Sequence, residues 1–370
     1  MTRREFVAGA AAFGVSGSVL QASAAPAERL WLGLLLHMTD NMWGDYSVPA
    51  FRRDAKKLVR GGGINPSLNF DVENFRRTVD YAVKGGCNLL MLDVGDAVVY
   101  PSHPEIAIKG SWSPERLNEE VKRLKKLGLE VVPKLNFSST HDSWLKDYHK
   151  MLTSQKYYEV CADLIRDICE ICDRPRYLHI GMDEETYGHQ WKFDFICLRS
   201  GELWWHDFNF LVNETEKNGA RAWTWCSTGR NHDPDKFAAR LPKSVIAGTG
   251  LYDEELEGFD FEKLSPKTLN YKCLYTMLAL DRAGIEQVPC VSNWLSPTQA
   301  KRGLKENAHS TAGVVKFSRE RLSPSLLKGF LAAPWSHCVT ESQYRYNCRG
   351  FDLLKEAVGR SGGKRQGEGT

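Results

Sequence analysis

Two adjacent carboxylates at the end of an apolar run are the residues of this sequence best placed to do chemistry. Residues 177–182 are typical of a buried strand, and Asp183, Glu184 and Glu185 follow it directly. Neighbouring acids can retain one proton near neutral pH, as a general acid requires. The same pattern also fits a strand followed by an acidic helix N-terminus, where carboxylates interact favourably with the helix dipole. The rest of the chain has to decide between the two interpretations.

Further polar and aromatic residues stand where other apolar runs end. If these runs are parallel strands of one barrel, their carboxyl ends meet at a single mouth, where such enzymes carry their reactive groups. Carboxylates, Trp rings and amides gathered there would suit a carbohydrate, because acids transfer protons and aromatic faces stack on pyranose rings. The candidate substrate-binding residues are His37, Asp93, Asp96, Asn136, His141, His179, Trp223, Trp225, Tyr252 and Trp294.

Several of these candidates also have a purely structural interpretation. His179 lies in the middle of a predicted strand and fits a core histidine, although its spacing puts it on the same strand face as the first acid of the pair. Trp223 and Trp225 share a strand face, so they either line a pocket or fill the barrel. Asp93 and Asp96 either bind sugar hydroxyls or cap the loop that follows them.

The elements that must position these residues form a repeated alternation of strand and helix. Several apolar runs are continuous, as expected for strands buried on both faces. Eight alternations predict the α/β class and a single (β/α)8 TIM barrel over residues 25–360. A doubly wound sheet is the alternative, but no G-x-G-x-x-G follows any strand. The predicted strands are residues 30–36, 87–92, 129–135, 177–182, 220–226, 244–249, 287–291 and 313–317, with a last helical region from 323 toward 335.

Composition narrows the classes of partner. The chain has 370 residues, 42% of them hydrophobic and 26% charged, as in ordinary globular proteins. Its net charge of +3 is spread without a basic block away from the ends, which argues against nucleic acid as the main partner. Ten cysteines show no spacing that would complete a zinc site, and Cys338 and Cys348 are one candidate disulfide pair. No cofactor or metal is predicted.

The two ends of the chain are predicted to lie outside the barrel. Residues 1–24 have the pattern of a twin-arginine export signal, with Arg3 and Arg4, small apolar residues over 7–20, and Ala22-Ser-Ala24 as a cleavage site. The apolar stretch is short for a membrane span. We therefore expect a periplasmic or secreted protein with no membrane association after cleavage. Residues 361–370 are rich in Gly and Lys, which predicts a disordered tail.

The segment His179-Ile-Gly-Met-Asp-Glu184 resembles the His-x-Gly-x-Asp-Glu motif of glycoside hydrolase family 20, the β-N-acetylhexosaminidases. Residues 131–136 with His141, and the loop 100–105, are similar to further family segments, so the resemblance covers about residues 70–255. It implies a (β/α)8 barrel that hydrolyses N-acetylhexosamine glycosides. Glu184 would be the general acid, and Asp183 would orient the substrate's acetamido group, which attacks the anomeric carbon. Tyr252 would hydrogen-bond the acetamido carbonyl.

The sequence also departs from the family pattern. The family has an arginine after its first strand, whereas residues 37–43 contain none; Lys134 replaces a family glutamate, and the final Trp-x-Glu has no clear counterpart. A changed sugar subsite or a different substrate is therefore expected. The predicted partner is an oligosaccharide or glycan, and the sequence does not specify the oligomeric state.

Two alternatives to a glycosidase remain open at this point. One is a barrel protein that binds sugar without hydrolysing it, which is consistent with the missing arginine. The other is a metal-dependent barrel hydrolase, which no ligand spacing supports. Its ligands would come from His37, Asp93, His141, His179 and Asp183.

Overall fold

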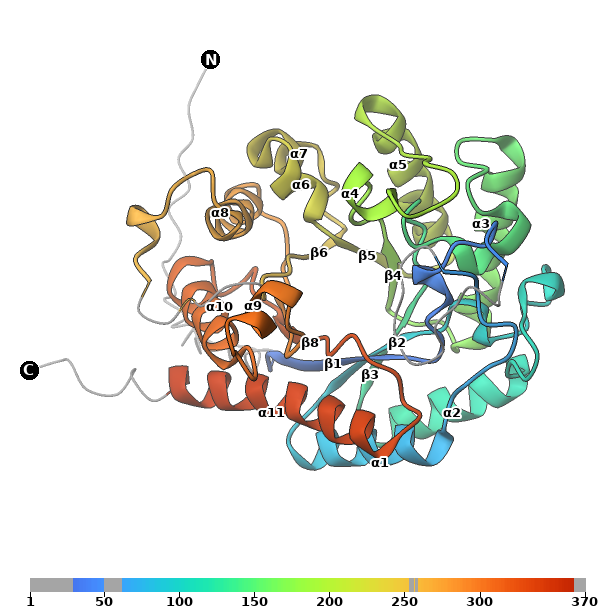
Figure 1. The fold of residues 1–370 in the computed structure, drawn as a ribbon, viewed down its shortest axis with the longest axis horizontal. Coiled ribbons are helices and arrows are strands. Elements are labelled where there is room, and N and C mark those ends of the chain that lie inside the picture. The colour runs from blue at the N-terminus through green and yellow to red at the C-terminus, as the bar shows by residue number, and fades with distance from the viewer. Residues whose placement is uncertain (1–28, 50–61, 253–255, 257–258, 363–370) are drawn as a thin grey trace, which may run out of the picture.

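The computed structural model of the protein describes residues 29–49, 62–252, 256 and 259–362. Eight strands form one parallel sheet that curls into a barrel, with helices around it (Figure 1). The strands are β1 (Trp31–His37), β2 (Leu89–Asp93), β3 (Glu130–Lys134), β4 (Tyr177–Gly181), β5 (Arg221–Trp225), β6 (Ile246–Gly248), β7 (Cys290–Val291) and β8 (Gly329–Ala332). The helices are α1 (Val72–Lys84), α2 (Pro114–Lys126), α3 (Gln155–Ile171), α4 (Tyr187–Gln190), α5 (Gly201–Lys217), α6 (Ser227–Asn231), α7 (Pro234–Arg240), α8 (Leu269–Arg282), α9 (Pro297–Lys301), α10 (Ala308–Arg321) and α11 (Glu341–Gly362).

The sheet closes through a seam between β6 and β7. The strand order is β6-β5-β4-β3-β2-β1-β8-β7, and every ladder between neighbours is parallel. Across the seam, single-residue bridges pair Ala247 with Gln287 and Gly250 with Cys290. The predicted (β/α)8 barrel is confirmed, and the doubly wound alternative is excluded.

Two hydrophobic layers explain why the strands are continuously apolar. One side of the sheet faces the helices, with Leu34 and Leu90 in that outer layer. The other side fills the barrel interior, where Leu35, Leu89 and Trp223 pack together. Because successive strand residues point to opposite faces, a strand between two apolar layers needs apolar residues throughout.

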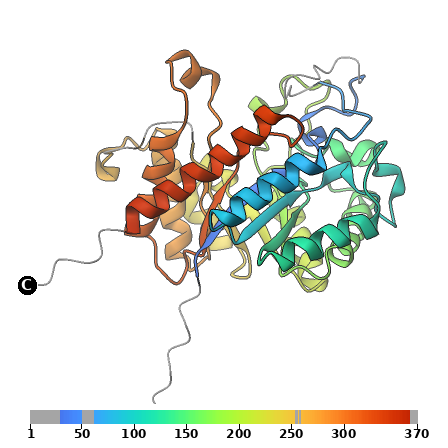
Figure 2. The ribbon, with the colours of Figure 1, turned by 90° about the horizontal axis from the view of Figure 1, so that it is seen from below.

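Capping side chains mark the starts of the first two helices. The Asp71 side chain accepts a hydrogen bond from the Asn74 backbone N–H at the start of α1, and Ser113 caps α2 in the same way, with Pro114 as the first helical residue. Figure 2 shows α11 running alongside α1, and the two helices are in contact. The Tyr81 hydroxyl donates to Asp352 Oδ2 between them at 2.8 Å. The last helix thereby covers the first strand–helix unit.

The predicted eighth strand is wrong. Residues 313–317 lie inside α10, where Val314, Val315 and Phe317 are buried, and the eighth strand is Gly329–Ala332. That strand falls in the region predicted as the last helix, which is α11 instead. A short, mostly apolar segment such as Gly-Val-Val-Lys-Phe fits a buried helical turn as well as a strand, so periodicity alone does not separate the two.

Other sequence-based expectations meet the structure only in part. The predicted export signal at residues 1–24 lies outside the described residues. Of the tail predicted to be disordered over residues 361–370, Ser361 and Gly362 belong to α11, and residues 363–370 lie outside the described residues. All ten cysteines are described and are free thiols, so Cys338 and Cys348 do not form a disulfide. None of the helices in the described part of the chain has the length and apolar character that a bilayer crossing needs.

Candidate active site

The backbone at the end of β4 has an unusual conformation. Gly181, Met182 and Glu184 have φ values of 75°, 65° and 54°, in the left-handed region that non-glycine residues rarely adopt. The pairing with β5 also shifts register between His179 and Gly181. Strained backbone of this kind is concentrated at functional sites. It interrupts the strand alternation, so Asp183 and Glu184 both line one pocket instead of facing opposite sides of the sheet.

Gly181 lets a neighbouring side chain approach the first acid. A Cβ atom at this position would lie 1.9 Å from Asn136 Oδ1, so no other residue fits without displacing it. The Asn136 Nδ2 group donates to Asp183 Oδ1 at 3.0 Å, and its Oδ1 accepts from the Ser138 backbone N–H at 3.0 Å. The glycine of the strand-four motif therefore makes room for the amide that holds Asp183.

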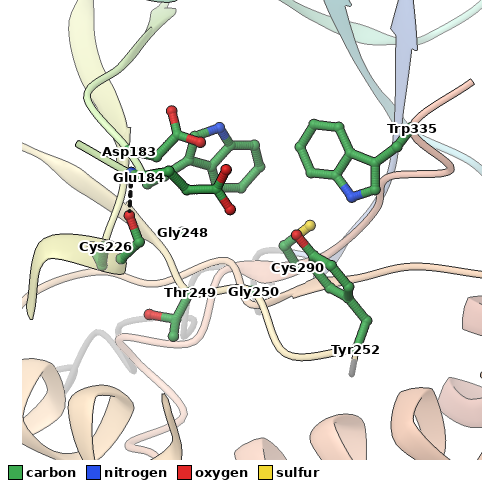
Figure 3. A pocket seen from close by; sticks show the side chains of 11 residues that line it. Asp183, Glu184, Cys226, Gly248, Thr249, Gly250, Tyr252, Cys290 and Trp335 are labelled. Carbon is green, nitrogen blue, oxygen red and sulfur yellow. Dashed lines mark hydrogen bonds between the residues drawn. The ribbon is translucent and has the colours of Figure 1, made fainter. Parts of the chain in front are cut away.

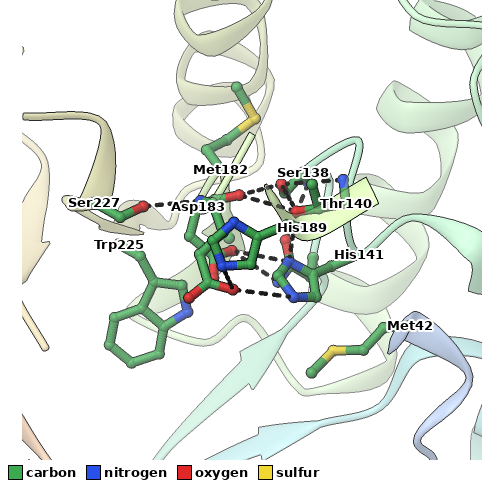
Figure 4. A network of polar contacts seen from close by, with 12 residues as sticks. Met42, Ser138, Thr140, His141, Met182, Asp183, His189, Trp225 and Ser227 are labelled. Carbon is green, nitrogen blue, oxygen red and sulfur yellow. Dashed lines mark hydrogen bonds and ion pairs between the residues drawn. The ribbon is translucent and has the colours of Figure 1, made fainter. Parts of the chain in front are cut away.

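Asp183 lies in a polar network from the loop after β3 (Figure 4). The hydroxyls of Ser138 and Thr140 donate to its backbone carbonyl, Thr140 at 3.2 Å. His141 Nδ1 lies 3.6 Å from Asp183 Oδ1. Burial opposes ionisation of this carboxyl, but the charge and hydrogen bond of His141 outweigh burial and hold its pKa below the ordinary value. Asp183 is therefore a carboxylate at neutral pH.

Glu184 lies between two histidines. His189 Nε2 is 3.1 Å and His141 Nε2 is 3.8 Å from Glu184 Oε2 (Figure 4). The Glu184 backbone N–H donates to Ser227 Oγ at 2.8 Å. His189 belongs to α4, directly after the acids, and its Nδ1 lies 2.7 Å from Thr186 Oγ1. His189 was not predicted from the sequence. The one signal that could have indicated it is its position five residues after Glu184.

The two acids face aromatic rings across a small pocket. Figure 3 shows the Glu184 carboxylate pointing toward the space between the acids and the rings of Tyr252 and Trp335, and Trp225 is a further wall. The pocket encloses about 30 Å³. Trp225 and Tyr252 were predicted from the sequence. Trp335 was missed, because it follows the strand that the sequence did not reveal. The remaining lining residues are Cys226, Ser227, Gly248, Thr249, Gly250 and Cys290.

Two predicted substrate-binding residues belong instead to a buried charge cluster. Asp93 pairs with the Lys134 ammonium group, and His37 Nδ1 lies 3.2 Å from Asp93 Oδ2. Burial would raise the pKa of Asp93, but Lys134 and His37 lower it to about 2. All three side chains are almost fully buried. Their burial and mutual pairing place His37 and Asp93 in the barrel interior and not in the pocket wall.

Four other candidates also stand apart from the pocket. Asp96 is buried and accepts from Asn41 Nδ2 at 2.6 Å, which ties the loops after β2 and β1 together. His179 Nδ1 accepts from the Gly181 backbone N–H at 3.0 Å, so it supports the bent strand end instead of contacting Asp183. Trp223 stacks on Trp31 in the interior, and Trp294 packs edge-on against Tyr252. None of these four residues lines the pocket, and the substrate contacts predicted for them stay predictions.

The loop after β1, which lacks the family arginine, contributes an acid at the other side of the mouth. Asp40 Oδ2 lies 3.3 Å from His337 Nε2. His337 is two residues after Trp335, so a Trp-x-His sequence follows β8.

A metal ion would find three grouped ligands at this site. His141, Asp183 and Glu184 each offer one atom, and these atoms lie within 4.8 Å of one another. The larger ligand set suggested by the sequence is not assembled, because His37 and Asp93 lie with Lys134, whose positive charge opposes a cation there.

The fold and site together define a (β/α)8 barrel with an acid pair at its mouth. No sequence-family profile and no curated protein sequence matches the chain. Solved structures of glycoside hydrolase family 20 are similar in fold. The β-N-acetylhexosaminidase of Streptomyces coelicolor A3(2) has a TM-score of 0.55 and 15% identity over 90% of this chain and 70% of its own. The β-N-acetylhexosaminidase of Bacteroides fragilis has a TM-score of 0.57 and 11% identity over 88% of this chain and 65% of its own. Dispersin B has a TM-score of 0.52 and 15% identity over 89% of this chain and 98% of its own.

Proposed function

We propose that the protein is a glycoside hydrolase that cleaves N-acetylhexosamine-type glycosides. The observation that carries the proposal is the shared pocket, in which Asp183 and Glu184 face three aromatic side chains. Similarity in fold to family 20 β-N-acetylhexosaminidases supports the reaction class, and the substrate is inferred from the pocket.

The size of the pocket supports an acetamido substituent. A volume of about 30 Å³ exceeds what one water needs and is far smaller than a sugar-binding cavity. It suits a group of a few heavy atoms, with its methyl against Trp225 and Trp335 and its carbonyl near the Tyr252 hydroxyl. The sugar ring would then lie at the open mouth, with its anomeric carbon beside the acids.

The two acids would have different roles in the reaction. Glu184 donates a proton to the glycosidic oxygen while the acetamido oxygen attacks the anomeric carbon, so the leaving group departs as an alcohol and a cyclic intermediate forms. Asp183, held ionised by His141, polarises the acetamido N–H and stabilises the positive charge that develops. Glu184 then accepts a proton from the water that opens the intermediate.

Replacement of the proposed general acid tests this assignment. Glu184→Gln should lower kcat about 10²–10⁴-fold on a disaccharide, since its leaving group needs protonation. The loss should be much smaller on a 2,4-dinitrophenyl N-acetylglucosaminide, because that leaving group departs without a proton. Steady-state kinetics on both substrates measure the difference.

Glu119→Gln, on the exposed face of α2, is the matched control and should leave both rates unchanged. An equal loss on both substrates would show that Glu184 is not the acid. A wild-type protein that binds chito-oligosaccharides and hydrolyses no N-acetylated glycoside would instead be a sugar-binding barrel.

The grouping of His141, Asp183 and Glu184 makes a metal-dependent hydrolase the second candidate. We expect prolonged dialysis against a chelator to leave the rate unchanged, because the proposed reaction uses only the acids and the substrate. Loss of activity that returns on adding one divalent ion would favour the metal-dependent reaction.

We also propose that the protein is exported by the twin-arginine route to the periplasm or the medium, on the basis of Arg3 and Arg4 and the apolar residues after them. Arg3→Lys with Arg4→Lys should retain the uncleaved precursor in the cytoplasm, whereas Arg360→Lys should not. Fractionation with immunoblotting measures this, and unchanged export of the double variant would refute the route.

A further inference from the structure

A second, larger cavity lies beside the proposed catalytic pocket and is lined by residues of α5, α6 and α7. Figure 1 shows where these three helices lie in the fold. Its volume is about 460 Å³, within the usual range for sites that bind small molecules. The two spaces are separated by adjacent residues of the chain. Glu184 and Ser227 line the catalytic pocket, while Glu185 and Thr228 line the larger cavity.

The cavity has an apolar base and an exposed polar rim. Trp204 and Phe237 are buried in its wall, with Trp205 next to them. The buried Trp204 Nε1 has no hydrogen-bond partner among the described residues. His232 and Ala239 on the rim are exposed, so an occupant would keep one side in water.

The charged residues of the wall are already neutralised. The Arg240 guanidinium donates to both Glu202 oxygens, at 2.6 and 2.8 Å. The other cations of the wall are similarly paired, and an anionic or cationic ligand would have to displace these partners. A neutral ligand is therefore favoured. The remaining pairs are Arg199–Glu185, Arg199–Asp207 and Lys236–Asp233.

We propose that this cavity is a second carbohydrate-binding site, which holds a neutral pyranose ring outside the catalytic pocket. A pyranose has an apolar C–H face that can pack on the aromatic base where the Arg240 guanidinium, which lies 4.5 Å from the Trp205 ring centroid, leaves it uncovered, and hydroxyls that can reach the rim and water. A hydrocarbon would instead leave apolar surface exposed at the open side. The choice of a sugar among neutral amphipathic ligands rests on the function proposed for the neighbouring pocket. The Ser200 and Thr228 hydroxyls are the nearest polar groups to such a ring.

Filling the cavity tests the proposal without touching the acids. Ala239 lines the cavity and is exposed, so Ala239→Trp and Ala239→Arg occupy its space with different chemistry. Each is made in the Glu184→Gln background, and chitotetraose binding is measured by isothermal titration calorimetry. We expect two sites per chain in the parent and one in both filled variants, the lost site being weakened at least tenfold. Lys355→Trp, on the exposed face of α11, should keep both sites.

The proposal is overturned if the parent binds one chitotetraose, or if both filled variants bind as the parent does while their thermal unfolding is unchanged. In the otherwise wild-type chain, Ala239→Trp should change turnover of an aryl N-acetylglucosaminide by less than twofold. A site lost on filling, in a chain that hydrolyses no glycoside, would uphold the second site and refute the proposed function. Turnover of an N-acetylated glycoside by a chain with a single binding site would uphold the proposed function and refute the second site.

Discussion

At the scale of single residues, the neighbours of each acid decide its role. Asp183 accepts from Asn136 and lies near His141, which holds it ionised, whereas Glu184 lies nearest His189. Adjacent carboxylates of the same chemistry thus receive different surroundings from two loops. Such a separation is what a reaction with one proton donor and one permanent carboxylate requires.

Asp96 provides a prediction about pH and stability. Burial is the main cause that raises its pKa to about 7, from an ordinary value of 3.8. The folded protein therefore keeps this proton up to about pH 7, while the unfolded chain releases it above about pH 4. The contribution of Asp96 to the free energy of unfolding is fully present below pH 4 and is lost as the pH rises to 7, by at most about 1.4 kcal/mol per unit.

Asp96→Asn should remove this pH dependence. Urea unfolding between pH 4 and 8 should show the stability of the wild type falling relative to the variant as the pH rises, and Glu119→Gln should show a constant difference. A constant difference for Asp96→Asn as well would mean that the native carboxyl titrates normally.

The sequence revealed the acids of the site and only part of its surroundings. Asp183 and Glu184 follow a long apolar run, so their position at a strand end was predictable. His189 lies on a four-residue helix that has no periodic signal. Trp335 was missed because it follows β8, which was not predicted. Asp93 was predicted as a site residue because it ends a strand, and its position in the sequence does not show that Lys134 pairs with it inside the barrel.

At the scale of elements, the bent end of β4 determines where the acids point. Gly181→Ala would place a methyl group 1.9 Å from Asn136 Oδ1, so the amide must move and release Asp183. We expect at least a tenfold loss of kcat, together with a loss of stability of more than about 1–2 kcal/mol, the cost of the left-handed conformation alone.

Gly219→Ala is the matched control for this prediction. Gly219 has a φ of 81°, and a Cβ added there would have nothing within 4 Å, so the substitution carries the conformational cost without a clash. It should lose stability and keep its rate. Equal effects of the two substitutions on both kinetics and urea unfolding would contradict the role assigned to Gly181.

Seven of the strands were predictable, most of them because burial on both faces leaves long apolar runs, although β6 and β7 have only three and two residues. The eighth strand, β8 (Gly329–Ala332), begins at a glycine with a φ of 153° and was not predicted. The run at 313–317 has two β-branched valines, which favour a strand, yet it belongs to α10, whose Val314 and Phe317 are buried. Short segments are decided by the tertiary contacts they make, which a local pattern does not contain.

At the scale of the whole molecule, the barrel interior holds an ion pair whose partners need each other. Lys134→Met would leave Asp93 buried beside His37 alone, and should cost about 3–5 kcal/mol in the free energy of unfolding. Asp93→Leu with Lys134→Met removes both charges and should recover most of that loss. Urea unfolding of the two single variants and the double variant measures the coupling, and additive losses would show that the charges act independently.

The seam between β6 and β7 links ligand binding to the integrity of the barrel. Among the described residues, two isolated bridges, Ala247–Gln287 and Gly250–Cys290, take the place of a continuous ladder there, so local opening and amide hydrogen exchange should begin at this seam. Gly250 and Cys290 also line the catalytic pocket. A substituent bound in that pocket, as proposed, would touch both sides of the seam, and its binding should slow exchange there and raise the temperature at which the barrel opens.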